Sequence, residues 1–258
     1  MRSHEVEYQV YGDDLQFAEV VLDPAESVIA EGGAMMCLED GIDFETVMGD
    51  GSEPDAGIFG KLKSAGRRVI SGESLFMTHF TNRGGGIQRV AYAAPYPGKI
   101  VPVDLAVTNG RLICQKDAFL CAAMGVKIDI VFNKEIGTGI FGGEGFILQE
   151  LAGDGLVFLH AGGTITEKRL TGDRLRVDTG CLVAFEETIE YSIERAGKLK
   201  SQVFGGEGLF LATLQGTGRV WLQSLPLSRL ADKIAPMGGG VAQGEGSVVG
   251  GISTIFER

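Results

Sequence analysis

Three glutamates, Glu73, Glu144 and Glu207, occupy the same position in a pattern that recurs along the chain. Each follows a glycine, and the last two stand in identical segments, Phe-Gly-Gly-Glu-Gly. Carboxylates held close together can act as general acid and base. Catalysis also needs convergent partner groups, and none is identifiable beside these residues. Because the position recurs, we favour a structural role, in which each carboxylate accepts backbone N–H bonds in a turn or pairs with an arginine.

The chain's histidines and nucleophiles do not form a recognisable site. His4, His79 and His160 are widely separated, with no His-x-His pair. A metal centre needs several such ligands at convergent positions, so we expect neither a metal nor a cofactor. No Gly-x-Ser-x-Gly segment occurs, and without a paired histidine there is no catalytic triad to propose. An enzyme whose site forms between subunits stays open as an alternative.

Seven basic residues gather before two of the recurring segments and could form an anion-binding rim. They are Lys61, Lys63, Arg67, Arg68, Arg195, Lys198 and Lys200. Such a rim could hold small anions, lipid headgroups or RNA phosphates. We favour solvated loops that balance nearby acids, because the net charge is −11 and the pI is about 4.8. The same acidity disfavours a nucleic-acid surface that extends over the fold.

The element that must position these residues occurs twice, at residues 141–159 and 204–222. The sequences FGGEGFILQELAGDGLVFL and FGGEGLFLATLQGTGRVWL align without a gap. Short apolar runs flanked by glycines favour two strands joined by a Gly-x-Gly turn. A weaker copy at residues 71–77 has SGES in place of GGEG. Apolar segments at 33–38, 117–122 and 180–185 precede the three copies at corresponding positions.

These repeats predict an all-β fold in a single domain of residues 1–236. We expect three degenerate β-units, at about 27–94, 112–161 and 175–224, packed around a pseudo-threefold axis as one sandwich or barrel-like body. A propeller is less suitable, because propellers have at least about four blades. Polar–apolar alternation also predicts strands at 5–11 and 15–22, and two short strands within 27–38.

The C-terminal part of the chain has a different pattern. Leu227, Leu230, Ala231 and Ile234 recur at helical spacing and predict a helix over residues 225–235, with Pro226 in its first turn and Pro236 ending it. The Gly-rich tail that follows, 237–258, still carries large apolar residues. It either packs on its own body or contacts a partner or subunit.

Compartment and membrane topology follow from what the sequence does not contain. The N-terminus is polar and acidic, without the apolar stretch of a secretion signal. No run of about 18 apolar residues occurs, so no spanning helix is expected. The four cysteines form no Cys-x-x-Cys pair. We therefore expect a cytoplasmic protein with buried, reduced thiols.

The combined motifs resemble the mitochondrial biogenesis family named for altered inheritance of mitochondria, which has many bacterial members. The matching stretches are LDPAESVIAEGGAMM at 22–36, SGESLFMTHF at 71–80, residues 141–163, GCLVAF at 180–185, FGGEGLFLATLQGTG at 204–218 and LPLSRLADKI at 225–234. The resemblance implies a β-sandwich of double-stranded β-helix type, similar to the trp RNA-binding attenuation protein. It also implies a homo-oligomer, for example a trimer. It supplies no catalytic residues.

The function expected from the sequence is therefore that of a non-catalytic oligomeric scaffold or assembly protein, acting on protein partners or at a membrane surface. A ligand-binding module for a small molecule, an anion or RNA is the main alternative. Fold similarity alone is weak evidence for either function.

Overall fold

The computed structural model describes residues 2–48, 76–131, 147–195 and 210–238. The chain divides into two compact units, 1–226 and 227–258, and each is described by itself. The first unit consists of β-strands with short 3-10 turns, and the second contains the helix α2, Leu227–Gly238. The prediction of an all-β fold is confirmed. No helix in the described parts of the chain is long and apolar enough to cross a bilayer.

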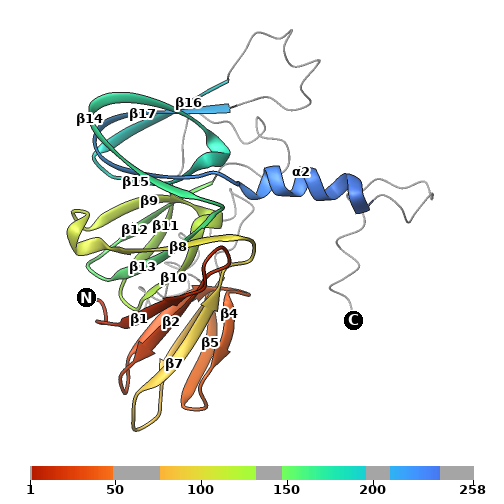
Figure 1. The fold of residues 1–258 in the computed structure, drawn as a ribbon. Helices are drawn as coiled ribbons and strands as arrows, with labels where there is room; N and C mark the ends of the chain where they lie inside the picture. The colour runs from red at the N-terminus through yellow and green to blue at the C-terminus, as the bar shows by residue number, and fades with distance from the viewer. Residues whose placement is uncertain (1, 49–75, 132–146, 196–209, 239–258) are drawn as a thin grey trace. The chain divides into compact units, whose positions relative to one another are not determined.

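Figure 1 shows the strands of the first unit in chain order. They are β1 Glu7–Tyr11, β2 Phe17–Leu22, β3 Ser27–Glu31, β4 Met35–Leu38, β5 Ile42–Met48, β6 Phe76–Asn82, β7 Gln88–Ala93, β8 Gly98–Asp104, β9 Arg111–Gln115, β10 Phe119–Ala123, β11 Lys127–Val131, β12 Leu148–Ala152, β13 Leu156–Gly162, β14 Ile165–Asp178, β15 Leu182–Glu186, β16 Ile189–Arg195 and β17 Phe210–Gln223. Strands appear where alternation predicted them at 5–11, 15–22 and within 27–38.

The strands form three antiparallel sheets. The N-terminal sheet has the order β1-β2-β7-β4, and the middle sheet has the order β5-β6-β3-β10-β13-β8. The C-terminal sheet has the order β11-β12-β9-β15-β17-β14, with β16 paired to β17 beside this path. Strands β14 and β17 are 14 residues long and pair along almost their whole length. The C-terminal sheet therefore curls, as Figure 1 shows.

The central strands of the middle sheet, β3, β10 and β13, are buried on both faces, because a separate hydrophobic core lies on each side. One core joins it to the N-terminal sheet through residues such as Val20, Tyr92 and Phe158. The other core joins it to the C-terminal sheet through residues such as Ile29 and Leu112. Burial on both faces explains why β10 and β13 are nearly continuous apolar runs, without the alternation of a half-exposed strand. A third core lies inside the curl of the C-terminal sheet.

One pairing scheme occurs three times, in strands β2–β7, β8–β13 and β14–β17, which we call repeats 1, 2 and 3. In repeat 1, β3-β6-β5 is one three-stranded half and β2-β7-β4 is the other. In repeat 2 the corresponding halves are β9-β12-β11 and β8-β13-β10. In repeat 3 the two long strands run through both halves. The end of β14, the start of β17 and β16 form one half, and the start of β14, the end of β17 and β15 form the other.

The repeats are joined by strand pairing. Strand β3 of repeat 1 pairs with β10 of repeat 2, and β9 of repeat 2 pairs with β15 of repeat 3. The middle sheet is thus built from one half of repeat 1 and one half of repeat 2, and the C-terminal sheet from the other half of repeat 2 and the whole of repeat 3. Strands β2, β8 and the first part of β14 begin the repeats earlier than the sequence pattern predicts. The closed pseudo-threefold arrangement stays a prediction.

The two Gly-x-Gly segments have different structures. In repeat 2, Gly153 and Gly155 lie in a turn between β12 and β13, which belong to different sheets. In repeat 3, Gly216 and Gly218 lie inside the continuous strand β17, so the expected turn is wrong there. Gly216 has φ 142° in that strand, and an added Cβ would lie 2.5 Å from the carbonyl oxygen of Thr188. The backbone bends at this glycine, and the ladder to β14 shifts register opposite it, between Thr171 and Arg174, before it continues.

The helix also differs from its predicted bounds. It begins at Leu227, directly after Pro226, and continues through Pro236 to Gly238. A proline in the last turn removes one intrahelical hydrogen bond, which a helix end tolerates better than its interior does. The tail beyond it, 239–258, lies outside the described residues.

The imidazole of His160 is buried in the first unit. The His160 side chain on β13 is 1% exposed and meets the ring of Tyr96 edge-on, with centroids 4.3 Å apart. Burial lowers the pKa of His160 from its ordinary value of 6.5 to about 4. The folded protein therefore holds this imidazole neutral at neutral pH.

Substituting Gly216 with alanine should destabilise the fold by about 2–3 kcal/mol, because the new Cβ would combine positive-φ strain with a backbone clash. Gly172 is the matched control, since it also has positive φ, 100°, but a Cβ added there would meet nothing within 4 Å. Gly172→Ala should cost only about 1 kcal/mol. Urea unfolding curves measure both changes; equal losses would contradict the role of Gly216 in bending β17.

The burial of His160 predicts loss of stability in acid. The unfolded chain binds this proton near pH 6.5 and the folded chain only near pH 4. The contribution is therefore complete above about pH 6.5 and falls by about 1.4 kcal/mol per pH unit below it. Urea unfolding from pH 7.5 to 5 should show a shallower acid loss for His160→Gln than for the wild type. Parallel profiles of the two proteins would exclude this origin.

Candidate functional site

Most residues singled out in the sequence lie outside the described parts of the chain. This holds for the glutamates Glu73, Glu144 and Glu207 and for six of the seven rim residues. The six are Lys61, Lys63, Arg67, Arg68, Lys198 and Lys200. The seventh, Arg195, is the last residue of β16, where its backbone pairs with Phe210 of β17. The structural role of the glutamates and the anion-binding rim both stay predictions.

The three histidines are not brought together. His4 accepts a hydrogen bond at Nδ1 from the backbone N–H of Ser27 (2.9 Å), His79 lies on β6, and His160 lies on β13. Among the described residues, no group of three or more His, Cys, Asp or Glu side chains could hold a metal ion.

The cysteines differ in environment. Cys114 and Cys121 are fully buried, and burial raises the pKa of each thiol well above its ordinary range. Cys181 is partly buried. Cys37 on β4 is exposed. The expectation of buried thiols therefore holds for two cysteines and is wrong for Cys37.

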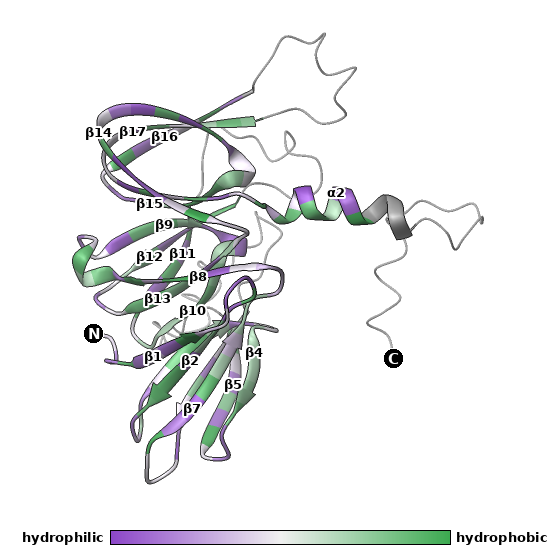
Figure 2. Cartoon of the chain, in the orientation of Figure 1, coloured by the Kyte–Doolittle hydropathy of each residue, from purple (hydrophilic) through white to green (hydrophobic). Residues whose placement is uncertain are grey.

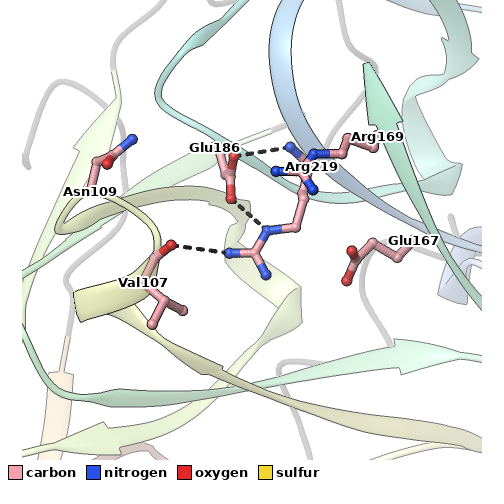
Figure 3. A pocket seen from close by; sticks show the side chains of 6 residues that line it. All are labelled: Val107, Asn109, Glu167, Arg169, Glu186 and Arg219. Atoms are coloured by element: carbon pink, nitrogen blue, oxygen red, sulfur yellow. Dashed lines mark hydrogen bonds and ion pairs between the residues drawn. The ribbon is translucent and has the colours of Figure 1, made fainter. Parts of the chain in front are cut away.

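A polar cleft of about 480 Å³ lies beside the curled strands of the C-terminal sheet (Figure 3). Its lining residues are Val107, Asn109, Glu167, Arg169, Glu186 and Arg219. The two arginines stand directly opposite each other on β14 and β17. Like charges facing one another across a strand pair are unfavourable unless an acid compensates them.

Glu186 provides that compensation from the end of β15. The Arg219 backbone N–H donates to Glu186 Oε2 (3.0 Å), and its Nε–H donates to Oε1 (2.6 Å). A terminal guanidinium nitrogen donates to the carbonyl oxygen of Val107 (3.4 Å). The Glu186 and Arg219 side chains are 13% and 25% exposed, so this pair is shielded from water more than a surface ion pair is.

The same clamp occurs in repeat 1. The Arg89 backbone N–H donates to Glu39 Oε2 (2.8 Å), and its guanidinium donates to Oε1 (3.4 Å). Glu39 and Arg89 hold the positions in repeat 1 that Glu186 and Arg219 hold in repeat 3. Because the same glutamate–arginine contact joins neighbouring strands in two repeats, we interpret it as structural. A bound ligand is not needed to explain this ion pair at the cleft. The cleft leaves Arg169 beside Glu167, a combination that offers a small polar solute little net charge.

The second candidate is the edge strand β4, an apolar segment that is exposed. Its residues Met35, Met36 and Cys37 are all exposed, with values of 39% for Met35 and 48% for Met36. Figure 2 shows the apolar character of this strand. Among the described residues, β4 pairs only with β7, so its other edge presents backbone groups without a strand partner.

The equivalents of β4 in the other repeats are buried. Strand β10 is buried along its whole length, and β15 is buried except for its last residue. Met36 corresponds to Leu120 and Val183, which are 2% and 0% exposed. The ladder to the neighbouring strand shifts register at this same position in all three repeats. Strand β4 therefore has the apolar composition and the β-bulge of an interior strand, but no neighbouring strand buries it among the described residues.

Sequence analysis placed these three segments at corresponding positions but did not predict that one is exposed. The apolar sequence MMCL suggests burial as strongly as FLCA or LVAF does. Exposure depends on whether a strand from a preceding repeat is available to pair with the segment. The described residues place no strand of an earlier repeat beside β4.

Comparison with known proteins relates the whole strand body to one family. The family model "Mitochondrial biogenesis AIM24" matches residues 8–225. An uncharacterized protein of Streptococcus pyogenes serotype M6 is 30% identical over 216 residues, which is 83% of each chain. The crystal structure of a protein from Streptococcus pyogenes matches with a TM-score of 0.71 and 21% identity, over 90% of this chain and 100% of that one. The chain belongs to the mitochondrial biogenesis AIM24 family.

Proposed function

We propose that this protein is a non-catalytic oligomeric assembly protein and that its working surface is the edge strand β4. The observation that carries the proposal is the exposure of Met35, Met36 and Cys37 on a strand whose equivalents are buried. An apolar strand edge is a template for pairing with another chain, and soluble proteins usually block such edges with charge, proline or a covering segment. Met35–Leu38 contains neither a charged residue nor a proline.

The chemistry of the described residues supports a binding role over a catalytic one. The cleft's most buried ion pair recurs in repeat 1 as a strand clamp, as shown by the matching hydrogen bonds of Glu186 and Glu39. The His160 imidazole is buried and packs edge-on against the ring of Tyr96. A general acid or base must instead be within reach of a substrate.

The exposed thiol supports a reducing compartment such as the cytoplasm. Cys37 is a free cysteine at the surface, and free surface thiols persist where glutathione and thioredoxin keep them reduced. A thiol on the proposed contact strand would be protected from oxidation once a partner covers it.

The proposal predicts that the native protein has a mass that is a multiple of 27.4 kDa. Met36→Glu should weaken this assembly at least tenfold, because it places an unpaired charge at a contact that the equivalent residues bury. Native mass spectrometry and light scattering across a dilution series measure the change. Met36 is half exposed in the single chain, so the variant should still fold.

Ile87→Glu is the matched control, since Ile87 is also apolar and 54% exposed but lies in the turn between β6 and β7. This variant should assemble as the wild type does. A wild-type protein that stays at 27.4 kDa at micromolar concentration would contradict the proposal. So would an assembly that Met36→Glu leaves unchanged.

A further inference from the structure

The two pairings that join successive repeats have the same register. Between repeats 1 and 2, Cys121 of β10 stands opposite Ala30 of β3. Between repeats 2 and 3, Ala184 of β15 stands opposite Cys114 of β9. Cys121 and Ala184 are equivalent residues, and so are Ala30 and Cys114. The junction is therefore a repeated structural rule of this chain.

Two strand edges of the kind that form these junctions have no such partner among the described residues. Repeat 1 supplies β4, the equivalent of β10 and β15. Repeat 3 supplies the end of β14, residues 174–178, the equivalent of β3 and β9. Within the described residues β4 pairs only with β7, and β14 pairs only with β17. The missing junction would place Cys37 opposite Val177 and Leu38 opposite Arg176.

We infer that β4 of one chain pairs antiparallel with the end of β14 of a second copy, with Cys37 opposite Val177. This inference rests on the proposed assembly function and names its partner. The N-terminal sheet, β1-β2-β7-β4, is then completed by β14, β17 and β16 of the neighbour. The completed sheet has the composition of the middle sheet, where β5-β6-β3 continues into β10-β13-β8.

The layers favour pairing between chains over closure within one chain. Strand β4 belongs to the N-terminal sheet and β14 to the C-terminal sheet. These sheets pack on opposite faces of the middle sheet through separate cores. Pairing the two edges within one chain would require one of these layers to leave its core. A second copy meets no such obstacle.

Burial at the proposed junction agrees with the two existing ones. Cys121 and Ala184, which have a neighbouring strand, are 0% exposed. Their equivalent Cys37, which has none among the described residues, is exposed. On the other edge, Val177 is already 7% exposed and faces the core inside the C-terminal curl. Directly opposite residues point to the same face, so pairing would bring the Cys37 thiol to that core.

Charge at the end of the junction is also complementary. Between repeats 2 and 3, Arg111 donates to Glu187 at 2.7 Å. The equivalent residues at the open edges are Arg174 on β14 and Asp40, which follows β4. An arginine thus meets an acid again, although the two residues lie on different chains. This contact would complement the ion pair of Arg174 with Glu194 (3.0 Å).

Each chain uses two different edges, so the contact is heterologous, and repeated association gives a ring or, if the rotation does not close, a filament. The full chain with Val177→Cys, in a Cys181→Ser background that removes a neighbouring thiol, tests the register. Cα atoms of directly opposite antiparallel residues lie about 4.5–5.5 Å apart, which suits a disulfide. Mild oxidation should produce a ladder of covalent multimers on a non-reducing gel.

Two control variants define the register. Arg176→Cys in the same background should give no ladder, because its side chain points to the opposite face. Adding Cys37→Ser to Val177→Cys should abolish the ladder. An assembly that never crosslinks, although native mass spectrometry shows a multiple of 27.4 kDa, would overturn this junction and leave the proposed function standing. A monomer would overturn both. A disulfide formed within single chains would overturn pairing with a second copy.

A charge exchange provides a test that does not depend on oxidation or on folding of the Val177 variant. Asp40→Arg and Arg174→Asp should each weaken assembly about fivefold, and the double variant should recover most of the loss. Dilution followed by native mass spectrometry measures the three dissociation constants. Losses that simply add in the double variant would contradict contact between these residues.

Discussion

The fold depends on a strand of one repeat pairing with a strand of the next. Without the β3–β10 ladder, the middle sheet would separate into two three-stranded halves. Without the β9–β15 ladder, the C-terminal sheet would separate into β11-β12-β9 and the four strands of repeat 3. Small isolated sheets are marginally stable, so each repeat needs its neighbour to bury the strands in between. The middle sheet contains strands of two repeats, and the remaining strands of those repeats lie in the two outer sheets. The two cores on the faces of the middle sheet therefore connect strands of different repeats.

The same dependence explains the ends of the body. A chain of repeats that stabilise one another by contact must either cap its terminal repeats or offer them to a partner. Repeat 1 gains β1 beside β2 but keeps an apolar edge at β4. Repeat 3 keeps its two halves together because β14 and β17 run through both halves and stay paired on either side of the register shift opposite Gly216. The proposed self-assembly would cover both of these open edges.

The sequence predicted the all-β class, the corresponding segments of the repeats and the β12–β13 turn, because glycine spacing and apolar runs are local features. It did not show that the second Gly-x-Gly lies inside β17. A Gly-x-Gly segment can form either a turn or a bend within a strand, and the strands that pair with it decide which. The leading strands β2, β8 and β14 share little sequence, and only their pairing reveals their equivalence. The clamp of Glu39 on Arg89 and the exposure of Met36 depend on contacts between distant segments, which periodicity does not encode.

The most direct test of this account is backbone hydrogen exchange of the assembled and the diluted protein, measured on peptides that cover Met35–Leu38 and residues 174–178. Amides that join a new ladder exchange only when the ladder opens. The account predicts that both peptides are protected together at high concentration and that both lose this protection on dilution, while β10 and β15 stay protected throughout. Exchange in β4 that is equally fast at all concentrations, in a protein of oligomeric mass, would contradict the claim that this edge holds the assembly together.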